Sequence, residues 1–129
     1  MHIPPGFGTV SPYFFVEDAN SFVTFLLRGL GGREVLRHLR DDGRIANAQV
    51  QLGTSTVMVS EASSAYPATK ASYYLYVADA DASVGQALAA GGALEMPVQN
   101  MPYQDRQGGV KDQHGNIWWI SQRLQSGPY

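Results

Sequence analysis

The chain contains no cysteine, which excludes disulfide bonds, thiolate nucleophiles and thiolate metal ligands. It lacks any apolar run near the roughly 20 residues that a transmembrane helix needs. Its first residues, MHIPPG, have neither the charged nor the apolar region of a signal peptide. Charged residues make up 16% of the chain, and the nine basic ones form no stripe that would suit a nucleic acid or an anionic membrane. We therefore expect a soluble, cytoplasmic protein without nucleic-acid or membrane partners.

What the chain does contain is an internal repeat, because its second half matches its first at an offset of 61 residues. The identities at this offset are Ser11/Ser72, Tyr13/Tyr74, Val16/Val77, Asp18/Asp79, Ala19/Ala80, Val23/Val84, Leu27/Leu88, Gly31/Gly92 and Glu34/Glu95. The length of 129 residues and 44% apolar composition suit one globular domain that spans the chain. Two copies of one supersecondary unit within that domain are therefore predicted.

Each copy follows the pattern of a β-α-β-β-β module. In the first, an Asp N-cap at position 18 precedes an amphipathic helix over about 19–30, and Asp41-Asp42-Gly43 marks a hairpin turn. In the second, the equivalent helix covers about 80–90, residues 100–109 form a loop, and residues 110–112 a short strand. Module 1 spans about 7–60, a linker 61–70, and module 2 about 71–123. The expected fold class is α+β, with a curved mixed sheet that carries a cleft and has its helices outside.

Strand periodicity predicts which residues share the face of the sheet opposite the helices. That face should carry Ser, Tyr, Phe, Asn, Gln and Trp but no carboxylate or histidine. Such a lining is typical of a pocket for an organic ligand, although it would equally suit a dimer interface or a second core. The candidate ligand-binding residues from the two modules are Tyr13, Phe15, Asn47, Gln49, Tyr74, Tyr76 and Trp119.

Two further candidates lie in the expected loop over 100–109. Tyr103 would cover the cleft, or would simply be an exposed loop tyrosine. Arg106 would hold a polar group of a ligand, or would pair with Asp105 and brace the loop. The histidines (His2, His38 and His114) have no metal-binding spacing and are interpreted as surface residues.

Several segments resemble those of the vicinal-oxygen-chelate superfamily, which includes glyoxalases, bleomycin resistance proteins and extradiol dioxygenases. The segments YFFVEDAN and YLYVADAD resemble the strand-to-helix openings of its modules. The segment from Tyr103 to Ser121, YQDRQGGVKDQHGNIWWIS, resembles the closing motif of its glyoxalase-like subgroup, with Gln113 in place of the usual proline. The duplicated β-α-β-β-β module is the hallmark of this superfamily.

The resemblance also implies where a metal would bind. Enzymes of the superfamily place His and Glu ligands at positions that fall here on Ser11, Val57, Ser72 and Trp119. A shift of one residue would substitute Met58 and Trp118, or Thr56 and Ile120, for the two Glu positions. The subgroup's His-Ala-Glu stretch reads Asn47-Ala48-Gln49. None of these side chains is a good ligand for a divalent ion, so no metal or other cofactor is expected. Trp119 would instead offer a stacking surface, or would plug a dead site.

The resemblance thus predicts a metal-independent protein of the bleomycin-resistance type, a homodimer that sequesters an aromatic or peptidic ligand such as an antibiotic. Two alternatives stay open at this point. One is a lyase, isomerase or oxygenase of the same superfamily with a non-standard metal site. The other is an interaction domain whose concave face is filled by a partner chain.

Overall fold

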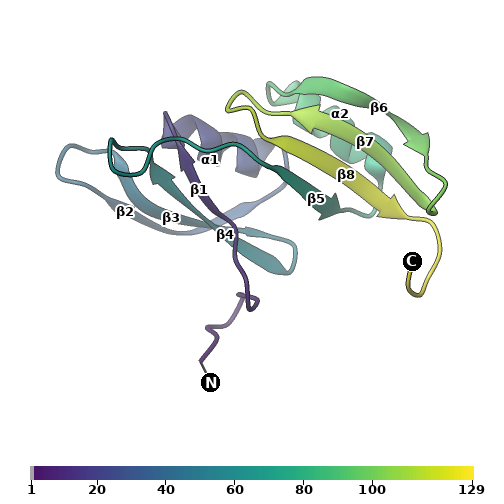
Figure 1. Cartoon of the computed structure of the whole chain (residues 1–129), viewed down its shortest axis with the longest axis horizontal. Coiled ribbons are helices and arrows are strands. Elements are labelled where there is room, and N and C mark those ends of the chain that lie inside the picture. The colour runs from purple at the N-terminus through teal and green to yellow at the C-terminus, as the bar shows by residue number, and fades with distance from the viewer. Residues whose placement is uncertain (1) are drawn as a thin grey trace. The chain divides into compact units, whose positions relative to one another are not determined.

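The structure, a computed structural model, describes residues 2–129. The chain divides into two compact units, one that extends to Thr69 and one from Lys70 to Tyr129. Each unit contains one helix and one four-stranded sheet, and each is described by itself (Figure 1). The predicted α+β class and the two tandem β-α-β-β-β modules are confirmed.

The first unit has its strands in the order β1-β4-β3-β2. β1 runs parallel to β4, and the other two strand pairs are antiparallel. Its elements are β1 (Tyr13–Val16), α1 (Ala19–Arg28), β2 (Arg33–Leu39), β3 (Ile45–Leu52) and β4 (Ser55–Glu61).

The second unit repeats this topology in the order β5-β8-β7-β6, with β5 parallel to β8. Its elements are β5 (Ser72–Tyr76), α2 (Ala80–Ala89), β6 (Ala93–Asn100), β7 (Asp105–Lys111) and β8 (Ile117–Arg123). No helix within residues 2–129 is long and apolar enough to cross a membrane.

Each helix buries its apolar stripe against one face of its own sheet. Phe22 and Leu26 of α1 are fully buried, together with Val50 and Val59 of the strands beneath them. In the second unit, Trp118 and Ile120 of β8 lie on the buried face, as the strand period predicts. A fully buried side chain of this size stabilises the fold by roughly 1.5–3 kcal/mol.

The last strand of each module also caps the helix that precedes it. In the first unit the Glu61 carboxylate accepts hydrogen bonds from the backbone N–H groups of Asp18 and Ala19, both at 2.9 Å. In the second unit Gln122 occupies the equivalent place, and its Oε1 accepts from Ala80 N at 3.1 Å. Glu61 adds its negative charge to that of the N-cap Asp18 at the N-terminus of α1, where a helix favours negative charge.

Strand pairing refines the repeat. The offset of 61 holds for β1 and β4, since Tyr13 pairs with Met58 and Tyr74 with Trp119. It changes to 60 for β2 and β3, because Gln49 pairs with Met58 and Gly109 with Trp119. Two of the sequence identities, Gly31/Gly92 and Glu34/Glu95, fall in this part of the chain and are therefore not structural equivalents.

The expected loop over 100–109 is wrong. Residues Asp105–Lys111 form the full-length strand β7, and only residues 101–104 turn. Gly108 and Gly109 of this strand both allow close packing. A Cβ on Gly108 would lie 2.9 Å from a Val84 methyl group of α2, and one on Gly109 would lie 2.7 Å from the Trp119 ring.

We expect Glu61→Ala to lower the free energy of unfolding by about 0.5–2 kcal/mol, because two backbone donors at the start of α1 lose their acceptor. Glu61→Gln should cost less, since it keeps an acceptor and removes only the charge. Urea denaturation measures both, with Glu17→Ala at an exposed neighbouring position as the control. Equal stability of Glu61→Ala and the control would contradict the capping role.

Candidate functional site

In the first unit, the face of the sheet away from α1 carries a chain of polar contacts. Ser60 Oγ donates to the carbonyl of Ala46 at 2.6 Å, so the Tyr13 hydroxyl donates to Ser60 Oγ at 2.7 Å. Asn47 Nδ2 in turn donates to the Tyr13 hydroxyl at 3.2 Å. The structure therefore brings two of the predicted ligand-binding residues, Tyr13 and Asn47, into direct contact, with their polar groups already paired.

Aromatic rings stack beside this chain of contacts. Phe15 lies with its ring centroid 4.8 Å from that of Tyr13, and the two planes differ by 12°. Tyr66, from the segment after β4, stacks with Phe15 at 5.6 Å. Stacking of this kind contributes about 0.5–1.5 kcal/mol per pair beyond area burial. Tyr13 and Phe15 thus form part of an ordered aromatic stack.

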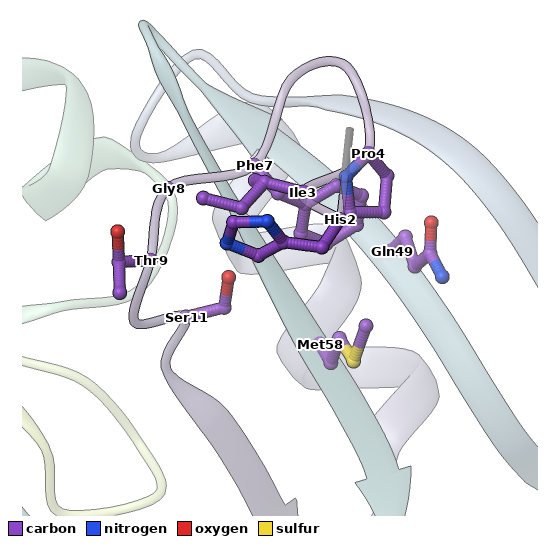
Figure 2. A pocket seen from close by; sticks show the side chains of 9 residues that line it. All are labelled: His2, Ile3, Pro4, Phe7, Gly8, Thr9, Ser11, Gln49 and Met58. Carbon is purple, nitrogen blue, oxygen red and sulfur yellow. The ribbon is translucent and has the colours of Figure 1, made fainter.

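A pocket of about 540 Å³ opens on the same face. Figure 2 shows its lining, with residues of the N-terminal arm above the side chains of Gln49 from β3 and Met58 from β4. The arm is fixed by the Thr56 hydroxyl, which donates to the carbonyl of Gly6 at 2.6 Å. The lining consists of His2, Ile3, Pro4, Phe7, Gly8, Thr9, Ser11, Gln49 and Met58. Its size and its mixture of apolar surface with a few polar groups suit a small organic ligand.

In the second unit, the equivalent face is organised around a buried carboxylate. Asp105 has no exposed surface, and its Oδ2 accepts hydrogen bonds from the hydroxyls of Tyr74 and Tyr129, each at 2.6 Å. Its Oδ1 lies 3.1 Å from Arg123 NH1. The expectation that this face has no carboxylate is therefore wrong. A loop over 100–109 hides the alternation of side chains along β7, and this alternation places Asp105 beside Tyr74.

These contacts shift the pKa values of the groups involved. Burial, followed by the hydrogen bond to Asp105, raises the pKa of Tyr74 to about 12. Loss of water around its hydroxyl, followed by the hydrogen bond to the same carboxylate, raises the pKa of Tyr129 far above its ordinary value, although most of the residue is exposed. Burial alone would raise the pKa of Asp105, but the hydrogen bonds from Tyr129, Tyr74 and Arg123 outweigh it and hold that pKa below its ordinary value. Asp105 is thus an anion at neutral pH.

Tyr103 and Gln107 continue the same face. The Tyr103 hydroxyl donates to Gln107 Oε1 at 2.5 Å, and Gln107 Nε2 donates to Ser121 Oγ at 2.8 Å. Gln107 is buried, while Tyr103 keeps 42% of its surface exposed. Tyr103 therefore belongs to the polar face of the second unit, held by one hydrogen bond at its tip.

Trp119 lies on this face, as predicted, while its neighbour Trp118 is in the core. Gly109 is its partner across the strand pair, and the Trp119 ring occupies the space that a side chain at 109 would need. Trp119 stays half-buried. One part of the indole is therefore held by the sheet while another part is free to contact a ligand.

Arg106 is placed elsewhere. Its guanidinium binds both carboxylate oxygens of Asp81 in α2, at 2.7 and 3.0 Å, and also Asn100 Oδ1 at 2.9 Å. It does not pair with Asp105, which faces the opposite side of β7. Arg106 thus braces α2 against the sheet and does not share a face with Tyr74, Tyr76 and Trp119.

The family's metal-ligand positions need one correction. Val57 is 3% exposed and lies in the core beneath α1, so the position equivalent to Trp119 is Met58, which faces the pocket. The four positions therefore hold Ser11, Met58, Ser72 and Trp119. Two hydroxyls, a thioether and an indole do not fit a divalent metal ion. Within residues 2–129, no group of three or more His, Asp or Glu side chains is arranged to hold one.

The sequence reasoning missed several residues of these faces. His2, Ile3, Pro4 and Phe7 line the pocket, although the N-terminal segment carries no periodic pattern that would have placed it on the sheet. Tyr76 was predicted on the face, but its partner Tyr129 was not, because residues after the last strand lie outside the repeat. One signal in the sequence could have found Asp105: if residues 105–111 are interpreted as a strand, Asp105, Gln107 and Gly109 alternate and share one face.

Several solved structures share this fold. TioX from Micromonospora sp. ML1 is 28% identical, covers 92% of this chain and 100% of its own, and superposes with a TM-score of 0.75. TnmS3, an antibiotic binding protein from Streptomyces sp. CB03234, is 20% identical with coverages of 95% and 98% and a TM-score of 0.73. A member of the glyoxalase/bleomycin resistance protein/dioxygenase superfamily from Sphaerobacter thermophilus is 18% identical, with coverages of 95% and 100% and a TM-score of 0.71.

Relatives found by sequence also match over most of the chain. An uncharacterized protein of Mycobacterium bovis is 27% identical over 127 residues, which cover 90% of this chain and 84% of the relative. No protein-family model matches the sequence. The solved structures confirm the resemblance, and the chain has the fold of the vicinal-oxygen-chelate superfamily.

We expect Asp105→Asn to lower the pKa of Tyr74 from about 12 part of the way toward 10. The neutral amide no longer disfavours the phenolate, while burial, the larger cause, remains. Absorbance at 295 nm against pH measures the titration, and Tyr74→Phe identifies which transition belongs to this residue. An unchanged titration in Asp105→Asn would contradict the contact.

The same shifts set how stability depends on pH. The pKa of Tyr74 is raised, so its contribution to the free energy of unfolding is complete below about pH 10 and is lost as the pH rises toward 12. The pKa of Asp105 is lowered, so its contribution is complete above about pH 4 and is lost as the pH falls through its folded value. Urea denaturation from pH 2 to 11 should show both losses, and Asp105→Asn should weaken both.

Proposed function

We propose that the protein binds a small aromatic or peptidic molecule without a metal ion and acts by sequestering it. The observation that carries this proposal is the pocket on the polar face of the first unit, where apolar side chains of the arm meet Gln49, Ser11 and Met58. An apolar wall with few polar groups binds an organic ligand by burial and orients it by hydrogen bonds. Affinity alone is sufficient for sequestration.

The chemistry of the two faces supports binding rather than catalysis. The superfamily's ligand positions hold side chains that do not fit a metal ion. Asp105 is committed to two tyrosines and an arginine, so it is not poised as a general base at neutral pH. TnmS3, which shares the fold, is an antibiotic binding protein, and we extend that role to this chain as the proposal that it confers antibiotic resistance.

A thermal-shift screen against aromatic and peptide antibiotics, bleomycin included, tests the proposal. A compound that binds only the folded protein stabilises it by about 2.7 kcal/mol at a concentration 100 times its Kd. We expect the stabilisation to persist in excess EDTA and metal analysis to find no stoichiometric zinc, nickel, manganese or iron. Stabilisation that EDTA abolishes would favour the metal-dependent alternative, and no stabilisation by any compound would contradict the proposed function.

We propose that Trp119 gives the second unit a stacking surface of its own for an aromatic ligand. Trp119→Ala should then weaken binding of a compound found in the screen by about 1–3 kcal/mol, as for other aromatic anchors. Gly109→Ala should also weaken it, because the added methyl group displaces the indole. Trp119→Phe, which keeps a stacking ring, is the matched control in isothermal titration calorimetry. Undiminished binding by Trp119→Ala would remove this residue from the site.

We also propose that the protein is a homodimer. The proposal is supported by apolar side chains on the edge strand β2, where Val35, Leu36 and Leu39 are 42%, 37% and 55% exposed. Light scattering should therefore give about twice the 14.0 kDa of one chain. A mass of one chain across micromolar concentrations would exclude the dimer.

A further inference from the structure

The segment after β8 folds back over the polar face of the second unit. The Tyr129 hydroxyl donates to Asp105 Oδ2 at 2.6 Å, and Tyr76 and Tyr129 share a hydrogen bond of 2.7 Å. The Arg123 guanidinium carbon lies 4.0 Å from the centroid of the Tyr129 ring, and Arg123 NH2 donates to the carbonyl of Pro128 at 3.2 Å. Residues of this face thus contact both the hydroxyl and the ring of Tyr129, and Arg123 also binds the preceding backbone carbonyl.

The hydrogen-bond directions follow from the number of protons. Tyr129 has a single hydroxyl proton, and it donates this proton in the hydrogen bond that the anionic Asp105 accepts. The Tyr76 hydroxyl is therefore the donor in the Tyr76–Tyr129 pair. The face consequently offers one carboxylate acceptor, one hydroxyl donor and one cation beneath a ring. Together these groups recognise the two properties of a phenol, its donating hydroxyl and its π surface.

Little apolar burial holds Tyr129 in place. Tyr129 is 68% exposed and Tyr76 is 57% exposed, whereas Asp105 is fully buried. The contact is therefore made by the hydroxyl and by one side of the ring. A group with the same chemistry and more apolar surface to bury would compete with Tyr129 for the carboxylate.

We propose that Asp105, Arg123 and Tyr76 form a subsite for a hydroxylated aromatic group of a ligand, and that Tyr129 occupies this subsite in the free protein as a displaceable latch. The inference rests on the proposed binding of an organic ligand. It adds the chemical class of the ligand and a device that regulates access. A ligand enters only when Tyr129 leaves, so its apparent affinity is reduced by the fraction of molecules in which the latch is open.

The subsite should discriminate sharply between a phenol and its methyl ether. A phenol replaces the hydrogen bond that Tyr129 gives to Asp105. An ether leaves the buried carboxylate without that donor, and loss of one partner from a buried polar pair is costly. Two small probes test this difference, 2-naphthol and 2-methoxynaphthalene, which share the same ring system.

The experiment compares the wild-type protein with Tyr129→Ala at pH 7, using fluorescence or calorimetric titration with each probe. We expect Tyr129→Ala to bind 2-naphthol about tenfold more tightly than wild type, the gain for a latch open in about one molecule in ten. Binding of 2-methoxynaphthalene should stay weak in both proteins. Tyr129→Phe, which keeps the ring but lacks the hydroxyl, should fall between wild type and Tyr129→Ala for 2-naphthol.

Equal affinity of wild type and Tyr129→Ala for 2-naphthol would overturn the latch, and an equal gain for both probes would overturn the phenol subsite. Tyr129 is exposed, so its replacement leaves the core intact, and far-UV circular dichroism verifies this. The antibiotic screen separates the two proposals. If screened compounds stabilise the protein while the probes behave alike, only this inference fails. If Tyr129→Ala gains 2-naphthol affinity while no compound stabilises the protein, only the proposed function fails.

Discussion

In each module one helix packs against one face of a four-stranded sheet, and the strand period of two then delivers alternate side chains to the face that the helix leaves uncovered. A sheet with one buried face usually presents solvated polar residues on the other. Here the second face carries rings and hydrogen-bonding groups that pair with one another, such as Tyr13 with Ser60 and Tyr74 with Asp105. The arm that ends in the first strand and the segment that follows the last strand both return to such a face. The pocket of the first unit and the Tyr129 contact of the second therefore each follow from the uncovered sheet face of their own unit.

The two modules differ at equivalent positions, and a large side chain at one position requires a small one at its neighbour. Where the first module has Gln49 beside Met58, the second has Gly109 beside Trp119. The indole needs the space that a side chain at position 109 would fill, so the pair had to change together. In the first module the unbranched side chains of Gln49 and Met58 stand in these places and line the pocket. Similarly, Glu61 caps α1 with a charge, whereas Gln122 caps α2 with a neutral amide beside the acidic Asp81 of its own first turn.

The fold was largely predictable because its signals are local and repeated. Asp18 and Asp79 before amphipathic stretches placed both helices, and alternation placed Trp118 in the core and Trp119 opposite. The site was less predictable, because two of its determinants depend on contacts between distant residues. Gly108 and Gly109 resemble a loop by composition, and only the approach of Val84 and Trp119 explains them within a strand. That interpretation concealed Asp105, the group around which the second face is organised, and it misassigned Arg106, whose partner lies in α2.

The motif that carries the family resemblance explains why the resemblance predicts structure better than chemistry. In the segment from Asp112 to Trp118, the Asp112 carboxylate accepts from the backbone N–H groups of His114 and Asn116 and from the Trp118 indole at 2.8 Å. These bonds fold the turn between β7 and β8 and fasten the core tryptophan to it. A motif with this role is needed by any protein that closes the module in the same way, whatever it binds. The function that we propose therefore depends on residues that the motif leaves unspecified, Met58 and Trp119 on the strands and the tyrosines around Asp105.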